Sequence, residues 1–99
     1  MSTNEQYTEH VNFPSAWLGG WESVNGNPDI YIFRGYEANY YLLAYSYDKE
    51  YGRGSFFCHE IEPDESGYYI RMGIKRCRLT PEEQPYGLHI TGWGSYMKN

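Results

Sequence analysis

The chain has 99 residues, of which 40% are apolar and 19% aromatic, and its formal net charge is −5. This length and composition fit one globular domain with a modest core and exclude intrinsic disorder over most of the chain. The negative charge disfavours nucleic-acid binding, and no stretch approaches the roughly 18 consecutive apolar residues of a membrane-spanning helix. We therefore predict a single domain that binds neither nucleic acid nor membranes.

The N-terminal residues are polar and lack any hydrophobic period, so we predict a flexible tail over residues 1–12 and one domain over 13–99. The start of the chain has neither the basic residues nor the apolar core of a secretory signal, which favours a cytoplasmic protein. Pro14 and Ser15 predict a short turn or a single helical turn before the first strand.

Alternating apolar residues predict β-strands along the rest of the chain, and no segment with a helical period is long enough to compete. Asn25-Gly26 is the strongest hairpin signal, because both residues tolerate positive φ. The pattern predicts six strands, at about 18–25, 29–34, 40–47, 55–61, 68–79 and 88–98.

Consecutive strands joined by short turns make an antiparallel meander, which leaves two bare edges if it stays open. Closing the first strand against the last removes both edges. The bends that closure needs are expected at glycines inside the predicted strands, namely Gly19, Gly20, Gly73, Gly92 and Gly94. We therefore predict an all-β, six-stranded antiparallel up-and-down barrel that is monomeric. The alternative is an open meander that forms an edge-paired dimer.

The fourth hairpin predicts a register and the state of the two cysteines. With its tip at residues 63–66, Glu62 faces Tyr68. The predicted inner layer is then Phe56, Cys58, Ile70, Met72 and Ile74. Cys77 lies five residues beyond the partner of Cys58, roughly 17 Å away at about 3.4 Å per residue, which is outside disulfide reach. We expect both thiols to be free.

Gly19-Gly20-Trp21 resembles the G-x-W motif near the start of lipocalins and their smaller lipocalin-like relatives. The resemblance implies an up-and-down barrel in which Trp21 closes one end, with Gly19 on the same face, and both are predicted structural anchors. Trp93, between two glycines on the closing strand, is assigned a similar role. Trp17 is expected to lie half exposed where the first strand begins.

The chain departs from full lipocalins, which have eight strands, a C-terminal helix and an arginine near the last strand that covers the tryptophan. Here the length allows about six strands and no long helix. Lys98 is the only cation near the end of the chain, so the role of that arginine is expected to be unfilled or altered.

The chain is also similar over its whole length to a small family of proteins from gut anaerobes, often carried on conjugative transposons. The similarity rests on the G-G-W-E segment and on the TGWGSYMK ending. It implies a role in mobile-element biology and a full-length chain, and it brings no activity and no catalytic residues.

The sequence contains no recognisable catalytic set. Its histidines are His10, His59 and His89, and Cys58 and His59 cannot act together because neighbours in a strand point to opposite faces. There is no G-x-S-x-G, H-E-x-x-H or phosphate-loop motif. We predict a protein that is not an enzyme and that uses no cofactor and no metal.

Two features are candidate partner-binding surfaces. The segment RMGIKRCR holds four of the eight cations, Arg71, Lys75, Arg76 and Arg78. They form either a basic stripe for an acidic partner or a solvated strand face. Three tyrosines share one face of the third strand, Tyr41, Tyr45 and Tyr47. If exposed, their rings would stack on a sugar, a base or a protein loop; otherwise they cover a small core.

These features favour a non-enzymatic binding module that holds a protein partner. The alternative is a carrier that holds a small ligand in the mouth of the barrel. A six-stranded barrel filled by aromatic rings would leave almost no cavity. An apolar pocket of roughly several hundred cubic ångströms would therefore reverse this order.

Overall fold

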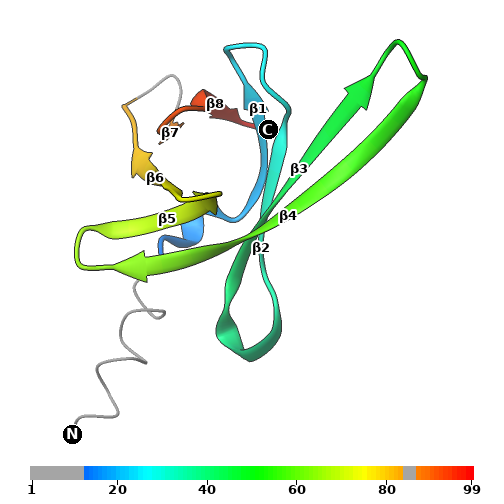
Figure 1. Cartoon of the computed structure of the whole chain (residues 1–99). Helices are drawn as coiled ribbons and strands as arrows, with labels where there is room; N and C mark the ends of the chain where they lie inside the picture. Colours follow the sequence, from blue (N-terminus) through cyan, green and yellow to red (C-terminus); the bar gives the residue numbers. More distant parts are fainter. Residues whose placement is uncertain (1–12, 84–86) are drawn as a thin grey trace, which may run out of the picture.

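The structure is a computed structural model that describes residues 13–83 and 87–99. Its strands form a closed antiparallel barrel in sequence order, in which each strand pairs with the next and β1 pairs with β8 (Figure 1). The strands are β1 Gly19–Ser23, β2 Ile30–Arg34, β3 Tyr40–Asp48, β4 Arg53–Asp64, β5 Gly67–Met72, β6 Lys75–Pro81, β7 Gly87–Ile90 and β8 Gly94–Lys98. Two short 3-10 turns accompany them, η1 Ser15–Trp17 and η2 Tyr36–Ala38.

The predicted fold class of six strands is wrong, because the barrel has eight. The expected strands at 68–79 and 88–98 are each two strands joined by a tight turn. Gly73 has φ +66° and turns the chain between the paired residues Met72 and Lys75. Gly92 has φ +84° in the turn between β7 and β8. Both glycines reverse the chain, whereas the sequence interpretation took them as bends within strands.

The predicted register between β4 and β5 is also wrong, by one residue. Glu62 faces Tyr69, and only residues 65 and 66 lie outside the ladder at the tip. A shift of one residue exchanges the two faces of a strand. Of the predicted inner layer, Ile70 is buried, while the others are exposed: Phe56, Cys58, Met72 and Ile74. Cys58 and Cys77 are both free.

The barrel interior is filled mainly by branched aliphatic side chains, one or two from each of the strands β2 to β7, together with Tyr96 of β8. Those that are almost completely inaccessible are Ile32, Leu42, Ile61, Ile70, Leu88, Ile90 and Tyr96. Alternate residues along each strand point inward, as closure of a small barrel requires.

One end of the barrel is closed by η1 and the residues around Trp21. The Trp21 indole N–H donates a hydrogen bond of 2.9 Å to the Trp17 carbonyl. The Lys98 ammonium lies 4.7 Å from the centroid of the Trp21 ring and donates to the Ala16 and Leu18 carbonyls. The cation at the end of the chain therefore covers the tryptophan on the first strand.

Trp17 is buried, which corrects the expectation that it lies half exposed. η1 carries its ring against Phe13, at 5.6 Å between centroids, and against Tyr68, at 6.1 Å. Trp17 therefore belongs to the same closing layer as Trp21.

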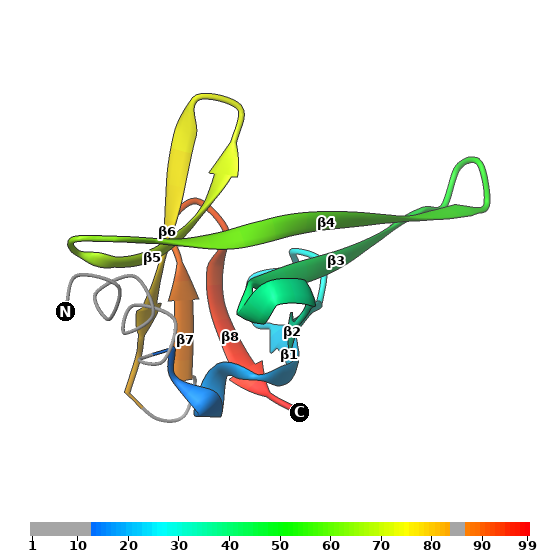
Figure 2. The same cartoon turned by 90° about the horizontal axis from the view of Figure 1, so that it is seen from below.

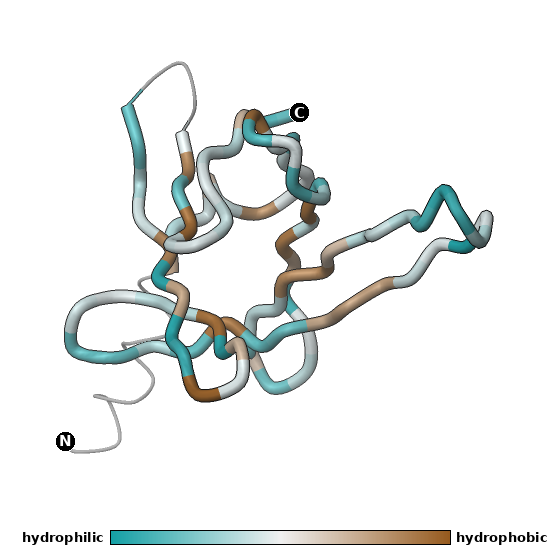
Figure 3. Tube along the Cα trace, turned by 45° about the horizontal axis from the view of Figure 1, so that its top comes forward, coloured by the Kyte–Doolittle hydropathy of each residue, from teal (hydrophilic) through white to brown (hydrophobic). Residues whose placement is uncertain are grey.

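The hairpin of β3 and β4 projects beyond the barrel (Figure 2). Pairing of β2 with β3 ends at Ala44, and pairing of β4 with β5 begins at Glu62. Among the described residues, positions 45–56 therefore form ladder pairs only with one another, and we refer to them as the arm. In Figure 3 the tip of the arm is hydrophilic, and the strands nearer the barrel are more hydrophobic.

Within the described residues, no helix has the length and apolar character needed to cross a bilayer. The predicted tail at 1–12, which includes His10, lies outside the described residues.

Candidate functional site

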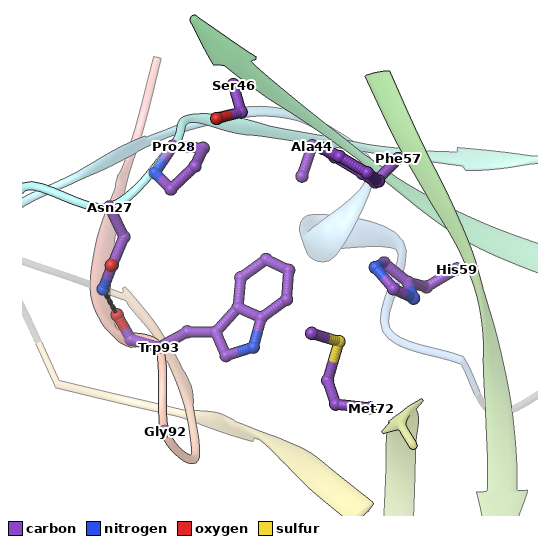
Figure 4. Close-up of a pocket in the computed structure, with 9 residues that line it drawn as sticks. All are labelled: Asn27, Pro28, Ala44, Ser46, Phe57, His59, Met72, Gly92 and Trp93. Carbon is purple, nitrogen blue, oxygen red and sulfur yellow. Dashed lines mark hydrogen bonds between the residues drawn. The ribbon is translucent and has the colours of Figure 1, made fainter. Parts of the chain in front are cut away.

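A pocket of about 350 Å³ lies at the end of the barrel opposite η1 (Figure 4). We refer to it as the mouth pocket. It is bounded by the loop between β1 and β2, the inner face of β3 and β4, the end of β5 and the turn between β7 and β8. Its lining residues are Asn27, Pro28, Ala44, Ser46, Phe57, His59, Met72, Gly92 and Trp93.

The space exists because small and large side chains face each other where the arm leaves the barrel. Ala44 and Ser46 are consecutive inward positions of β3, and Ala44 stands opposite Phe57 on β4. A methyl group and a hydroxymethyl group leave the ring of Phe57 uncovered on this side, and 54% of this residue is exposed. The inner face of the hairpin thus becomes a wall of the pocket.

Trp93 forms another wall, and two asparagines hold its turn in place. The Asn27 amide donates a hydrogen bond to the Trp93 carbonyl, and the Asn25 side-chain oxygen accepts one of 2.7 Å from the Ser95 N–H. Gly94, at φ +101°, permits this approach, because a Cβ there would stand 2.2 Å from the Asn25 oxygen. These contacts fix the β7–β8 turn against the β1–β2 loop.

The pocket is mostly apolar and has few polar groups. The His59 ring lies edge-on to Trp93, with centroids 5.9 Å apart and planes at 81°. His59 and the Ser46 hydroxyl supply hydrogen-bonding groups, and no lining residue carries a carboxylate or a thiol. Such a site can bind and orient a molecule, and in the described residues no hydrogen bond joins the Ser46 hydroxyl to the His59 ring. Among the described residues, no cluster of three His, Cys, Asp or Glu side chains is placed to hold a metal.

The four cations of RMGIKRCR lie on β5 and β6, and Lys75 stands opposite Met72, which lines the mouth pocket. Arg71 pairs with Glu62 at 2.8 Å, while Arg78 and Arg76 pair with Asp64 at 2.6 Å and 3.3 Å. Among the described residues, Lys75 is the one member of the four with no ion pair. Two carboxylates at the end of β4, Glu62 and Asp64, therefore balance half of the positive charge of this segment.

Asp64 is held strongly in its ionised form. The hydrogen bonds from Arg78 lower the pKa of its carboxyl from 3.8 to about 2, with help from the Ser66 N–H and the Arg76 charge. The same hydrogen bonds raise the pKa of Arg78, and Glu62 raises the pKa of Arg71. Arg76 also lies 4.5 Å above the Tyr69 ring. The cluster joins β4, β5 and β6 through charge and ring contacts.

The tyrosines at 41, 45 and 47 lie on the outer face of β3, opposite the inward residues that line the mouth pocket. Tyr41 stacks on Phe33, with centroids 5.6 Å apart, and Tyr45 contacts Phe56 on β4 at 4.8 Å. Tyr45 and Tyr47 are exposed. Their rings belong to the surface of the arm, which is a different region from the pocket.

The sequence predicts Trp93 as an anchor and leaves a ligand site in the barrel mouth as the alternative, but it does not predict the residues that line the pocket. Trp93 lies in the turn between β7 and β8, half buried, with its ring against the pocket. Asn27, Pro28 and Met72 were not expected to share a site, because they come from segments far apart in the chain. One available signal was the small pair Ala44 and Ser46 within an aromatic strand.

A family model described as "Domain of unknown function, B. Theta Gene description (DUF3876)" matches residues 3–98. No curated protein and no solved structure matches the chain.

Proposed function

The chain belongs to the family described as DUF3876, and from that premise and the geometry above we propose that it binds a small apolar molecule in the mouth pocket, without catalysis. The observation that carries this proposal is the apolar pocket of about 350 Å³ at the open end of the barrel. This volume lies in the usual range for ligand sites, which is roughly 300–1,000 Å³.

The pocket places ligand binding ahead of the partner-binding module that the sequence favoured. An eight-stranded barrel is just wide enough to hold one small ligand, which a six-stranded one is not. The basic segment offers less to an acidic partner than its sequence suggests, because three of its cations are already paired. Partner binding by Arg71, Lys75, Arg76 and Arg78 stays a prediction.

The lining favours a planar, largely apolar ligand with one hydrogen-bonding group. Aromatic rings of Phe57 and Trp93 provide flat contact surfaces, and the flexible side chain of Met72 adapts to different shapes. His59 and Ser46 would bind the polar group. Because the asparagine contacts fix the Trp93 turn in advance, little ordering is needed when the ligand enters.

A lipocalin-like character is part of this proposal. It is supported by eight strands in sequence order, by Trp21 at the closed end, and by Lys98 in the place where the resemblance expects an arginine. The association with mobile elements and the cytoplasmic location rest on sequence alone and stay predictions.

The test uses N-phenyl-1-naphthylamine, a neutral, flat dye that becomes fluorescent in apolar sites. We expect one dye molecule per chain to bind and to change the tryptophan emission of the chain, because Trp93 lines the pocket. Ser46→Phe should fill the mouth pocket and weaken binding about tenfold or more, which corresponds to about 1.4 kcal/mol. Ser66→Phe adds the same bulk at the tip between β4 and β5 and should leave binding unchanged.

The proposal fails if the native chain does not take up the dye, or if Ser46→Phe binds it as well as Ser66→Phe does. The second result would place the dye on the exposed aromatic surface of the arm. Circular dichroism of both variants establishes that they are folded.

A further inference from the structure

In the part of the chain that the structure describes, one edge of β4 has no neighbouring strand over most of its length. The Tyr45 N–H donates to the Asp29 carbonyl at 3.4 Å, so odd-numbered residues of β3 direct their backbone groups toward β2. In an antiparallel ladder two facing residues direct their backbone groups either toward each other or away from each other, so Phe56, which faces Tyr45, points away from β3. The even-numbered residues of β4 therefore point away from β3, and pairing with β5 is confined to residues 62–64. Within residues 13–83 and 87–99, four residues of β4 have outward N–H and C=O groups without a ladder partner, Gly54, Phe56, Cys58 and Glu60.

The side chains around this edge favour burial by another strand. Both faces of the hairpin carry exposed aromatic residues, with Phe56 66% and Phe57 54% exposed. Proteins usually protect such edges with charges, proline or a bulge, yet residues 53–59 contain a single charged residue, Arg53. A two-stranded ribbon is also marginally stable by itself. Pairing of this edge with another strand would therefore stabilise the arm.

We propose that the occupant is a second copy of this chain, which pairs antiparallel along the free edge of β4. A twofold axis normal to the sheet lets the same edge serve both copies and keeps their outer faces on one side. In the register centred on Phe56, this residue faces Phe56 of the second copy. The Tyr45–Phe56 ring contact of 4.8 Å then continues across the axis into a row of four rings.

The charge of the segment suits self-association. Asp48 and Glu50 balance Lys49 and Arg53, so residues 45–59 carry no formal net charge although the chain carries −5. Two arms can therefore approach without the repulsion that the whole molecule would suggest. The edge pairing uses backbone groups and the outer face, so it does not rest on ligand binding in the mouth pocket.

The test is the mass in solution over a range of protein concentrations, by light scattering after size exclusion and by sedimentation. We expect the native chain to dimerise reversibly. Cys58→Pro removes one outward N–H from each copy while leaving the β3–β4 ladder intact. We expect it to dimerise roughly thirtyfold more weakly. Cys58→Ser keeps the N–H and should dimerise like the native chain.

Phe56→Glu is the second variant, because it leaves the backbone unchanged and places two carboxylates opposite each other at the axis. It should be monomeric whether or not the proline variant folds. A native chain that is monomeric at every concentration would overturn the proposal. So would a dimer that neither Phe56→Glu nor a folded Cys58→Pro weakens, or a native chain that pairs only with a different protein.

Discussion

Tyr96 fills the barrel interior with its ring, yet in the described part of the chain its hydroxyl has no hydrogen-bond partner. Burial raises the pKa of this hydroxyl to about 12, and the nearby negative charge of Asp29 adds to the shift. A buried hydroxyl without a partner loses its hydration and gains nothing in return. The ring therefore stabilises the core, while the oxygen works against it.

Tyr96→Phe should leave stability at pH 7 unchanged or raise it by about 1–2 kcal/mol, because it removes the unpaired oxygen and keeps the ring. The variant should also resist alkali better. The hydroxyl of Tyr96 ionises from about pH 10 in the unfolded chain and near pH 12 in the folded one. The free energy of unfolding of the native chain therefore falls as the pH rises from about 10 to about 12. Urea unfolding of both chains at neutral and alkaline pH measures the difference. A variant that is clearly less stable at pH 7 would show that the hydroxyl is hydrogen-bonded.

The tryptophans show what single residues reveal in a sequence. Trp21 could be predicted as buried, because its position in G-x-W places it on an inward face. The burial of Trp17 could not be predicted, since it depends on η1 folding against the end of the barrel. The alternation of apolar residues that indicates strands does not indicate a 3-10 turn. The lysine contact was missed for a related reason: Lys98 and Trp21 are 77 positions apart and meet only when the barrel closes.

At the scale of elements, hairpins with strong turn chemistry were predictable and those without it were not. Asn25-Gly26 located the first hairpin, although the connection spans residues 24–29 and of this pair Gly26 alone has positive φ. Gly73 and Gly92 stand among residues that suit strands, and a lone glycine is equally compatible with a bend or a turn. Because these two turns were not predicted, six strands were expected where the barrel has eight. The error in the β4–β5 register exchanged the inner and outer faces of one predicted strand.

The Asp64 cluster joins β4 to β6 and should make their packing sensitive to acid. Because the folded pKa of Asp64 is about 2 and its ordinary value is 3.8, its ion pairs contribute fully above about pH 4 and are lost as the pH falls toward 2. Asp64→Asn should therefore be less stable than the native chain at pH 6, with the gap closing in acid. Urea midpoints along a pH series measure this gap.

Glu65→Gln is the matched control, because it removes one negative charge from the same turn without breaking an ion pair. Its urea midpoint should match that of the native chain at each pH of the series. A gap between Asp64→Asn and the native chain that stays constant from about pH 6 to about pH 2.5 would mean that the pairing with Arg78 and Arg76 contributes no pH-dependent stability.

At the scale of the whole molecule, the structure has a closed end, an open mouth and an arm. Closure was predictable, because a meander of apolar strands otherwise leaves two bare edges. The arm was not, since residues 45–56 alternate just as barrel strands do, and the place where they leave the barrel is set by the start of β2 at Ile30, which pairs with Ala44. The mouth pocket draws residues from the β1–β2 loop, β3, β4, β5 and the β7–β8 turn, so the small pair Ala44 and Ser46 is the local signal that the sequence offers for it.

The barrel should fold without the outer part of the arm. Replacing residues 47–54 with Asn-Gly would close the hairpin at the facing pair Ser46 and Ser55, with a turn suited to two residues. None of the removed residues belongs to the buried core. At protein concentrations low enough for the native chain to be monomeric, we expect the free energy of unfolding to change by less than about 1 kcal/mol.

The shortened chain should also remain monomeric at concentrations where the native chain dimerises, because Gly54 and most of the arm are gone and the remaining edge is too short to pair. Leu42→Ala provides the comparison for stability, since truncating this fully buried side chain should cost about 2–5 kcal/mol. A shortened chain that loses as much as Leu42→Ala would show that the arm supports the barrel fold. If it lost little stability but still dimerised, the interface would lie on the barrel.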